Sequence, residues 1–255
     1  MSVQLRDAVA VVSGGGSGIG RATAHSLARR GARVVVTDRD GDRADTVAGE
    51  LGERGIAAVC DVTRLEDLQA VRDLALERFG RVDIVMNNVG ILAVGPVQDI
   101  PLDAWQRVID VNLLGIVRSN LVFLPVLVEQ GAGHVVNTAS TAGLLPYGYE
   151  QMPYTATKHA VVGLSEALAL YLRPRGIGVS CLCPGSWPRT SWSRSPSTAR
   201  PRRRADRTPR CSTPARSANS SPTASPTTAS SFSRCRKSPT NCANAGPTWT
   251  PICRV

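Results

Sequence analysis

The sequence predicts an α/β fold built on a doubly wound parallel sheet. Across residues 1–185, short apolar runs rich in Val and Ala alternate with longer segments of helical periodicity. Such runs are typical of strands covered on both faces, and their alternation with helices implies right-handed crossovers between parallel strands. Glycine-rich or polar segments follow the runs, at the edge where such sheets bind ligands. We therefore expect one domain over residues 1–185.

Each expected strand is a short apolar or β-branched run, and each expected helix shows apolar residues three to four positions apart. The strands are expected at residues 8–13, 33–37, 57–60, 83–86, 134–137 and 179–183. The helices are expected at residues 21–30, 42–54, 65–79, 102–120, 121–130 and from the region of Tyr154 to about residue 172. Pro125 lies near the start of the fifth helix or at a kink in it.

The turn after the first strand is rich in glycine. It reads Gly-Gly-Gly-Ser-Gly-Ile-Gly over residues 14–20 and leads directly into a helix. Glycines let the backbone approach a pyrophosphate, and a helix N-terminus offers free N–H groups and a favourable dipole. The spacing is G-x-x-x-G-x-G, and in this strand–turn–helix context it predicts a dinucleotide-binding site.

Asp38 ends the second expected strand, 18 positions after Gly20. An acid at about this spacing bonds the adenosine ribose in dinucleotide-binding folds. Its carboxylate would repel a 2′-phosphate, so NAD is preferred over NADP as the expected cofactor, although the neighbouring Arg39 works against this preference. The alternative interpretation is an aspartate that only forms the turn after the strand.

Ser140, Tyr154 and Lys158 lie in one stretch of the chain. Tyr154 and Lys158 are four positions apart in a helical pattern, so they project from one face. A phenol has a pKa of about 10, and an ammonium one turn away lowers it. Ser140 follows a strand and could polarise a substrate carbonyl. These groups suit proton transfer to an oxygen while a hydride moves at the adjacent carbon, whereas the alternative is a solvated helix face.

Residues 1–185 resemble the classical short-chain dehydrogenase/reductase family in five motifs that occur in order. The family's T-G-x-x-x-G-x-G occurs at residues 13–20, with Ser13 in place of Thr. Its N-N-A-G occurs at residues 87–90, with Val89 in place of Ala. Its catalytic Asn, Ser, Tyr and Lys match Asn112, Ser140, Tyr154 and Lys158, and its P-G matches residues 184–185. Ser140 and Tyr154 are 14 positions apart, where the family has about 13, which indicates an insertion near residues 150–152.

The resemblance implies a Rossmann-like domain that interconverts a small-molecule secondary alcohol and a ketone with NAD(P). Tyr154 would be the acid/base, Ser140 would hold the reacting oxygen, Lys158 would assist Tyr154 and bond the ribose, and Asn112 would support a water relay. The resemblance also implies a homo-oligomer, a dimer or tetramer, formed through the helix from Leu102 and the Tyr154 helix. The implied cofactor contacts are Ser13, Gly14, Gly16, Ser17, Gly18, Ile19, Gly20, Asp38, Arg39, Asp61, Val62, Asn88, Val89, Gly90, Tyr154, Lys158, Pro184 and Gly185.

The net charge of +10 belongs to the end of the chain. Residues 1–185 contain 17 Lys and Arg and 19 Asp and Glu, whereas residues 186–255 contain 13 Lys and Arg and one acid. The basic charge therefore does not make the domain a nucleic-acid binder. Seven cysteines show no metal-ligand spacing and are expected as free buried thiols. No signal peptide or run of 18 apolar residues is evident, so a cytoplasmic protein with no metal and no membrane partner is expected.

Residues 186–255 form a tail rich in Arg, Pro, Ser and Thr, with little apolar content. Such a composition predicts disorder. Our hypothesis is a reading-frame shift in a GC-rich gene, which would compromise oligomerisation and leave a cofactor-binding remnant with impaired catalysis. The alternative is a genuine basic tail that binds nucleic acid. The nucleotide sequence near codon 186 would separate the two.

Overall fold

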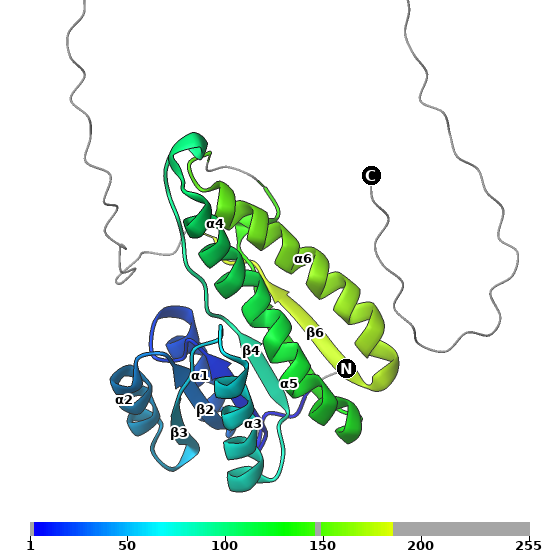
Figure 1. Ribbon diagram of the computed structural model, residues 1–255. Helices are drawn as coiled ribbons and strands as arrows, with labels where there is room; N and C mark the ends of the chain where they lie inside the picture. The colour runs from blue at the N-terminus through cyan, green and yellow to red at the C-terminus, as the bar shows by residue number, and fades with distance from the viewer. Residues whose placement is uncertain (1–2, 146–148, 186–255) are drawn as a thin grey trace, which may run out of the picture. The chain divides into compact units, whose positions relative to one another are not determined.

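Six parallel strands form the central sheet of the computed structural model, which describes residues 3–145 and 149–185 (Figure 1). The strand order is β3-β2-β1-β4-β5-β6, and every neighbouring pair is parallel. The strands are β1 (Val9–Ser13), β2 (Arg33–Asp38), β3 (Gly55–Val59), β4 (Ile84–Asn87), β5 (Gly133–Thr138) and β6 (Ile177–Leu182). This topology confirms the predicted doubly wound sheet. The predictions for residues 186–255 lie outside the described residues.

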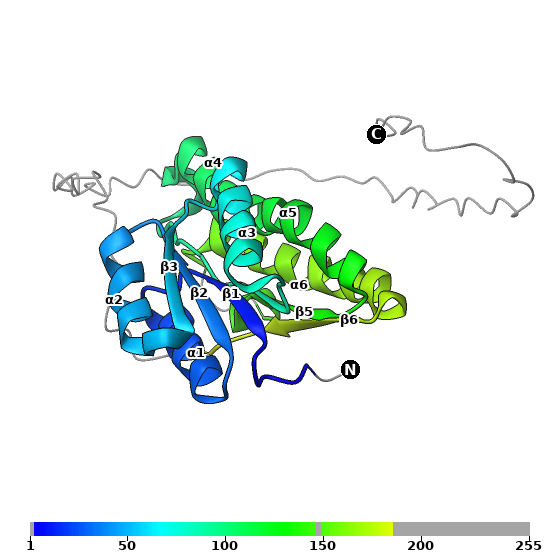
Figure 2. The same cartoon turned by 90° about the horizontal axis from the view of Figure 1, so that it is seen from below.

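Helices cover both faces of the sheet. They are α1 (Gly18–Arg29), α2 (Gly41–Leu51), α3 (Leu65–Phe79), α4 (Leu102–Ile109), α5 (Gly115–Gln130) and α6 (Met152–Leu172). Figure 2 shows α1 and α2 on one face and α3, α5 and α6 on the other. Strand bounds agree with the prediction to within two residues. The first helix starts inside the glycine-rich turn at Gly18, three residues earlier than predicted, and Gly18 has a φ of 52°, which glycine adopts readily.

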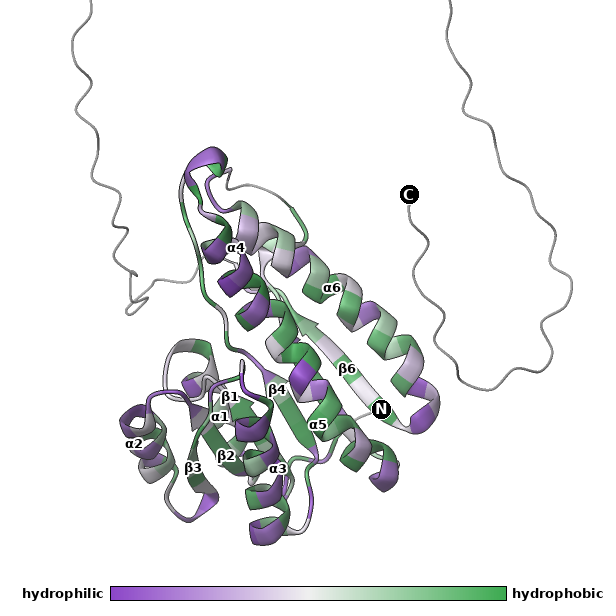
Figure 3. Cartoon of the chain, viewed as in Figure 1, coloured by the Kyte–Doolittle hydropathy of each residue, from purple (hydrophilic) through white to green (hydrophobic). Residues whose placement is uncertain are grey.

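The two faces of the sheet have separate cores, because side chains alternate along each strand. Val11, Val35 and Val85 face the helices α3, α5 and α6, where Phe123 and Leu127 complete the packing. The intervening residues, among them Val12, Val34, Val36 and Met86, pack against α1 and α2. Figure 3 shows apolar strands flanked by helices of mixed hydropathy, with long hydrophobic stretches in α5. Strands that are apolar on both faces explain why the runs in the sequence are continuous rather than alternating.

The fourth and fifth helices are one continuous segment, Leu102–Gln130, and the predicted break between residues 120 and 121 is wrong. The irregularity lies earlier, in a π-helical turn over Asp110–Leu114 that carries Asn112. Pro125 lies in the interior of α5 rather than near its start. A π-turn inserts one extra residue without interrupting the helix, so the hydrophobic period gives no sign of it, and such turns often occur at functional sites.

By length and composition alone, Leu102–Gln130 is long and apolar enough to cross a membrane. The same properties mark the core helix of a soluble fold, and here α5 packs on α3 and supplies Phe123 and Leu127 to the core. In α6, Val161 is fully buried and Leu168 is 9 % exposed, so both side chains belong to the core of this chain.

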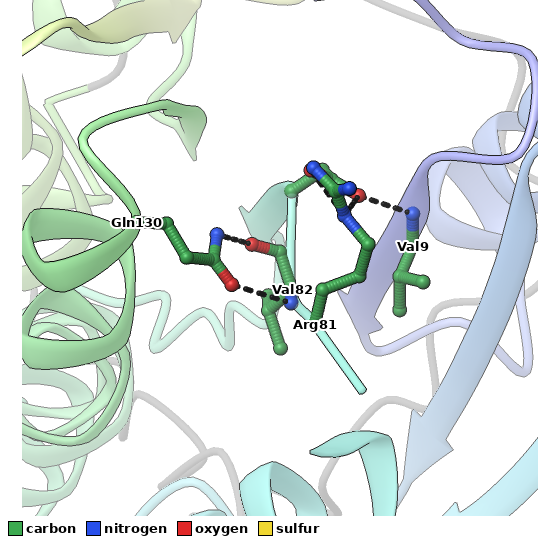
Figure 4. Close-up of polar contacts among 5 residues, drawn as sticks. Val9, Arg81, Val82 and Gln130 are labelled. Atoms are coloured by element: carbon green, nitrogen blue, oxygen red, sulfur yellow. Dashed lines mark hydrogen bonds and ion pairs between the residues drawn. The ribbon is translucent and has the colours of Figure 1, made fainter. Parts of the chain in front are cut away.

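The amino end of β4 is fastened to its neighbours by polar contacts (Figure 4). The buried Asp83 carboxylate accepts a hydrogen bond of 2.8 Å from the Val9 backbone N–H and a bidentate pair from Arg81. On the other side, the Gln130 side-chain amide both accepts from and donates to the backbone of Val82, at 3.2 and 2.6 Å. These contacts fix β4 between β1 and the end of α5. They thereby help to position the segment that directly follows β4.

Replacing Asp83 with Ala should destabilise the protein by about 3 kcal/mol, because the Val9 N–H would be left buried without a partner and Arg81 would lose its counter-ion. Urea unfolding followed by circular dichroism measures this. Asp73→Ala is the matched control, since Asp73 pairs with Arg72 but is 63 % exposed. It should change stability by less than about 0.5 kcal/mol. Equal effects of the two variants would contradict the assigned role of Asp83.

Candidate active site

The carboxyl edge of the sheet gathers the residues that the sequence singled out. Gly14 follows β1, Asp38 ends β2, Asn88 follows β4, Ser140 follows β5 and Pro184 follows β6. Because all six strands are parallel, their carboxyl ends open onto the same edge. Residues separated by up to 170 positions in the chain are thereby placed along one side of the domain.

The glycine-rich turn has no room for side chains at Gly16 and Gly20. A Cβ on Gly20 would lie 2.1 Å from the Gly14 carbonyl oxygen, and a Cβ on Gly16 would lie 2.9 Å from Asp38 Oδ2. The turn is also tied to β4, since the Ser13 hydroxyl donates to the Met86 carbonyl at 3.1 Å and accepts from the Asn88 N–H at 2.9 Å. The backbone itself is therefore the surface that this turn presents.

The start of α1 suits an anionic group. Ser17 is the N-cap, yet its side chain makes no capping hydrogen bond, and the first turn contains no acidic residue. The helix N-terminus thus keeps its positive end and its uncapped N–H groups. Ile19 contributes instead to the core against α1 and α2. The residues present fit the pyrophosphate of a dinucleotide, in agreement with the prediction from the glycine spacing.

Asp38 is held by backbone on both oxygens. Oδ2 accepts from the Gly16 N–H and Oδ1 from the Asp40 N–H, both at 3.2 Å. A carboxylate oxygen has more than one acceptor position, so the pair can still bond hydroxyl groups. Arg39 beside it is exposed. Asp38 therefore connects the end of β2 directly to the glycine-rich turn, which makes it more than a turn-forming residue.

Asp61 and Val62, which follow β3, lie at the same edge. Burial opposes ionisation of Asp61, but hydrogen bonds from Thr63 at 2.9 and 2.7 Å and the charges of Arg39 and Arg107 outweigh it, so the pKa of Asp61 lies below its usual range. Val62 is buried, and a Cβ on Gly115 would lie 3.0 Å from it. The predicted adenine-contacting residues thus form an ordered, negatively charged corner beside Asp38.

Lys158 is a buried cation at the centre of the site. Its side chain is 3 % exposed, its Nζ donates to the Thr138 carbonyl at 2.7 Å, and it lies 5.5 Å from the centroid of the Tyr154 ring. Burial lowers its pKa to about 8. Gly90 closes the other side, where a Cβ would lie 3.3 Å from Nζ. The predicted pairing of Tyr154 and Lys158 on one helix face is therefore present, and the motif that contains Val89 and Gly90 is packed against it.

Asn112 is fully buried and its side chain is held on every side. Its Oδ1 accepts from the Ile91 N–H at 2.8 Å, and its Nδ2 donates to the Ile91 carbonyl at 3.0 Å and to Thr157 Oγ1 at 3.2 Å. The Thr157 hydroxyl in turn donates to the Tyr154 carbonyl at 2.9 Å. Thr157 was missed by the sequence analysis, although its place directly before Lys158 could have indicated it.

Ser140 is buried at the start of the short 3₁₀ turn Thr141–Gly143, where its Oγ accepts from the Ala142 N–H at 3.2 Å. This turn packs directly on α6, since a Cβ on Gly143 would lie 2.5 Å from the Lys158 carbonyl oxygen. The Pro184 carbonyl accepts from the Thr141 N–H at 3.0 Å, which links the end of β6 to the same turn, and the exposed Gly185 follows. Ser140 and Lys158 thus belong to one packed unit.

A second buried polar chain joins the strands to α6. Asn87 Nδ2 donates to Asn137 Oδ1 at 2.9 Å, Asn137 Nδ2 donates to Ser165 Oγ at 3.0 Å, and Ser165 donates to the Val161 carbonyl at 2.6 Å. All three side chains are at most 5 % exposed. These hydrogen bonds were not predicted from the sequence. Their only local sign there is a polar residue at a strand position that faces inward.

Comparison with known proteins agrees with this arrangement. The sequence profile described as short chain dehydrogenase matches residues 8–199. The cyclohexanol dehydrogenase of Acinetobacter sp. (strain SE19) is 38% identical over 190 residues, which are 72% of this chain and 75% of the relative. The 3-alpha-(or 20-beta)-hydroxysteroid dehydrogenase of Mycobacterium bovis is 37% identical over 198 residues, 75% of this chain and 74% of the relative.

Among solved structures, a short chain dehydrogenase/reductase from Burkholderia phymatum in complex with NAD superposes with a TM-score of 0.71 at 38% identity, covering 73% of this chain and 68% of that one. The fold and the site define a dinucleotide-binding oxidoreductase. The chain belongs to the short-chain dehydrogenase/reductase family. The family identified from the sequence motifs is confirmed.

The buried Lys158 should make the free energy of unfolding depend on pH. Its pKa of about 8 in the folded protein is below that of an unfolded lysine, about 10.4, so the unfolded chain binds more protons between these values. The free energy of unfolding of the wild type therefore rises with pH across this window, and Lys158→Met lacks that rise. The stability difference, variant minus wild type, should be largest below pH 8 and fall as the pH approaches 10.

Urea titrations at several pH values between 7 and 10 measure this difference. Arg173→Met is the control, because Arg173 is exposed and an arginine keeps its charge throughout the range. Its stability difference should not depend on pH. A Lys158→Met difference that is equally constant would mean that the folded protein does not lower the pKa of Lys158.

Proposed function

We propose that the protein is an NAD-dependent oxidoreductase that interconverts a small-molecule secondary alcohol and the corresponding ketone. The observation that carries this proposal is the buried Lys158 cation, held between the Thr138 carbonyl and the Tyr154 ring at the edge that also bears the glycine-rich turn. The names of two relatives support the substrate class, since cyclohexanol and these hydroxysteroids are secondary alcohols.

In this proposal Tyr154 moves the proton at the substrate oxygen. The Lys158 ammonium stabilises negative charge on the phenolic oxygen, and the Ser140 hydroxyl hydrogen-bonds the substrate oxygen. Asn112 and Thr157 act as positioning residues, because Asn112 fixes the loop at Ile91 and Thr157 bonds the Tyr154 backbone. A bound nicotinamide cofactor supplies the site that accepts or donates the hydride.

The cofactor would be held by the carboxyl edge. The backbone of residues 13–20 would bind the pyrophosphate, Asp38 and Arg39 the adenosine ribose end, and Asp61 with Val62 the adenine. Residues 88–90, Tyr154, Lys158 and residues 184–185 would hold the nicotinamide half. This machinery lies within residues 1–185, which we propose as the functional domain. A homo-oligomer remains part of the proposal, formed through exposed side chains of the Leu102–Gln130 helix such as Leu121.

We infer that NAD is used in preference to NADP. The Asp38 carboxylate is fixed by two backbone N–H groups and cannot turn away from a ligand that lies along the glycine-rich turn. A 2′-phosphate would meet this charge and that of Asp61, whereas the 2′-hydroxyl of NAD can donate to Asp38. The NAD bound to the Burkholderia phymatum relative supports the same choice.

Tyr154→Phe should lower kcat for alcohol oxidation by about 10³, because it removes the group that accepts the proton. NADH affinity, followed by fluorescence, should change little. Tyr171→Phe on the exposed side of the same helix is the matched control and should leave turnover unchanged. Full activity of Tyr154→Phe would refute the role given to Tyr154. A wild-type chain that binds NADH but turns over no cyclic or linear secondary alcohol would favour the impaired, cofactor-binding alternative.

Asp38→Ser should weaken NADH binding about tenfold and narrow the difference in affinity between NADH and NADPH, since the charged acceptor is lost and the repulsion of the 2′-phosphate is relieved. Titration with each cofactor measures both affinities. Asp42→Ser is the control with the same loss of charge, at an exposed position in the first turn of α2. An unchanged ratio of the two affinities in Asp38→Ser would show that Asp38 does not select the cofactor.

A further inference from the structure

Six arginines gather at the amino end of the sheet, the end opposite the candidate active site. They line two adjoining depressions of about 600 and 450 Å³ that share Asp7 and Arg54. The arginine cluster consists of Arg6, Arg29, Arg30, Arg33, Arg54 and Arg78. Arg78 lies in the last turn of α3 and Arg54 in the 3₁₀ turn Gly52–Arg54 after α2; these two segments lie along the lower edge of Figure 1. Strand β1 is five residues long, so the cluster lies about 17 Å from the glycine-rich turn.

The cluster differs from the other arginines in its lack of counter-ions. Within residues 3–145 and 149–185, none of its six guanidinium groups forms an ion pair. Of the ten other arginines described, six are paired with a carboxylate: Arg21, Arg43, Arg64, Arg72, Arg81 and Arg118. Arg81, near the same end of the sheet, has a bidentate partner in Asp83. Most of the described arginines outside the cluster are therefore paired, whereas in the cluster six neighbouring arginines have no ion pair with the described part of the chain.

Helix ends explain part of this arrangement. Arg30 donates to the Ser26 carbonyl and Arg54 to the Gly31 carbonyl at 2.7 Å, and cations are favourable at helix C-termini. The side chains of Arg6, Arg29 and Arg78 donate no hydrogen bond to the described part of the chain, and Arg33 lies over the Phe79 ring at 5.5 Å. One basic residue would suffice for each helix end, so capping does not account for six guanidinium groups around two shared depressions.

The residues that line the two depressions indicate the class of ligand. Each depression has the volume of a small-molecule site. Several arginines with free donors match the oxygens of phosphate groups, which guanidinium binds through paired hydrogen bonds. Asp7 and Glu53 also line the depressions, so the positive charge is confined to parts of their walls, which suits a compact anion better than the continuous backbone of a nucleic acid. Leu51 and Phe79 add an apolar wall beside Arg33, against which an organic group can pack.

We propose that the arginine cluster is a binding site for a small organic ligand that carries two or more linked phosphate groups. The ligand would supply the negative charge that six unpaired guanidinium groups lack, and it would bind independently of the dinucleotide at the other end of the sheet. The chain as a whole would then carry two anion sites: one made of backbone N–H groups and one made of arginine side chains.

Tripolyphosphate is the probe for this site, titrated calorimetrically into the full chain in the presence of saturating NADH. We expect one site whose affinity falls at least about tenfold in the variant Arg6→Gln/Arg29→Gln/Arg78→Gln, because three charge-assisted donors are lost. The three side chains are exposed and form no hydrogen bond or ion pair within the described residues, so the melting temperature should be retained. Arg202→Gln/Arg203→Gln/Arg204→Gln removes the same charge from the tail and should leave the affinity within about twofold.

Three results would overturn the proposal. Displacement of tripolyphosphate by NADH would place the probe at the glycine-rich turn. A loss of affinity in the 202–204 variant but not in the 6/29/78 variant would assign the binding to the tail. A short RNA duplex that binds tenfold more tightly than tripolyphosphate, and that is equally sensitive to the 6/29/78 substitutions, would make the surface a nucleic-acid site. None of these results depends on whether the chain oxidises alcohols.

Discussion

The structure depends most on how it accommodates the buried ammonium of Lys158. A charge removed from water is strongly unfavourable unless it is paired or hydrogen-bonded. Here the Thr138 carbonyl at 2.7 Å and the face of the Tyr154 ring supply the negative potential, and burial still lowers the pKa to about 8. A Cβ on Gly90 would lie 3.3 Å from the Lys158 Nζ, and a Cβ on Gly143 would lie 2.5 Å from the Lys158 carbonyl oxygen. The segments after β4 and β5 are therefore packed closely against α6 at Lys158.

The Lys158 ammonium keeps these contacts only if α6 keeps a fixed position on the sheet. Apolar packing alone permits small slips, whereas buried hydrogen bonds have one geometry and leave unsatisfied groups if it is lost. Two series of buried hydrogen bonds fix the position of α6. One runs from the strands through Asn87, Asn137 and Ser165, and the other runs from the π-turn through Ile91, Asn112 and Thr157. They reach α6 at positions on either side of Val161. The helix that carries Tyr154 and Lys158 is thus positioned by polar contacts at two points along its length.

The sequence was sufficient for the features that arise locally. The strands follow from continuous Val-rich runs, the dinucleotide site from glycines between a strand and a helix, and the Tyr154–Lys158 pair from a spacing of four. It was insufficient where geometry is set by partners distant in the chain. The π-turn at Asp110–Leu114 leaves the hydrophobic period of Leu102–Gln130 intact, so the helix break was misplaced. Thr157 and Asn137 look like ordinary polar residues until their partners, 45 and 28 positions away, are known.

The direction of the helices makes the two ends of the sheet electrically different. In this fold each helix that follows a strand starts at the carboxyl edge and ends at the amino edge, so N–H groups gather at one edge and carbonyl groups at the other. The carboxyl edge presents the uncapped N–H groups of α1 together with two acids, Asp38 and Asp61. The amino edge favours cations instead, which stabilises arginines at the ends of α1, α2 and α3. Backbone N–H groups are thus the donors available to an anion at the carboxyl edge, and guanidinium groups are the donors available at the amino edge.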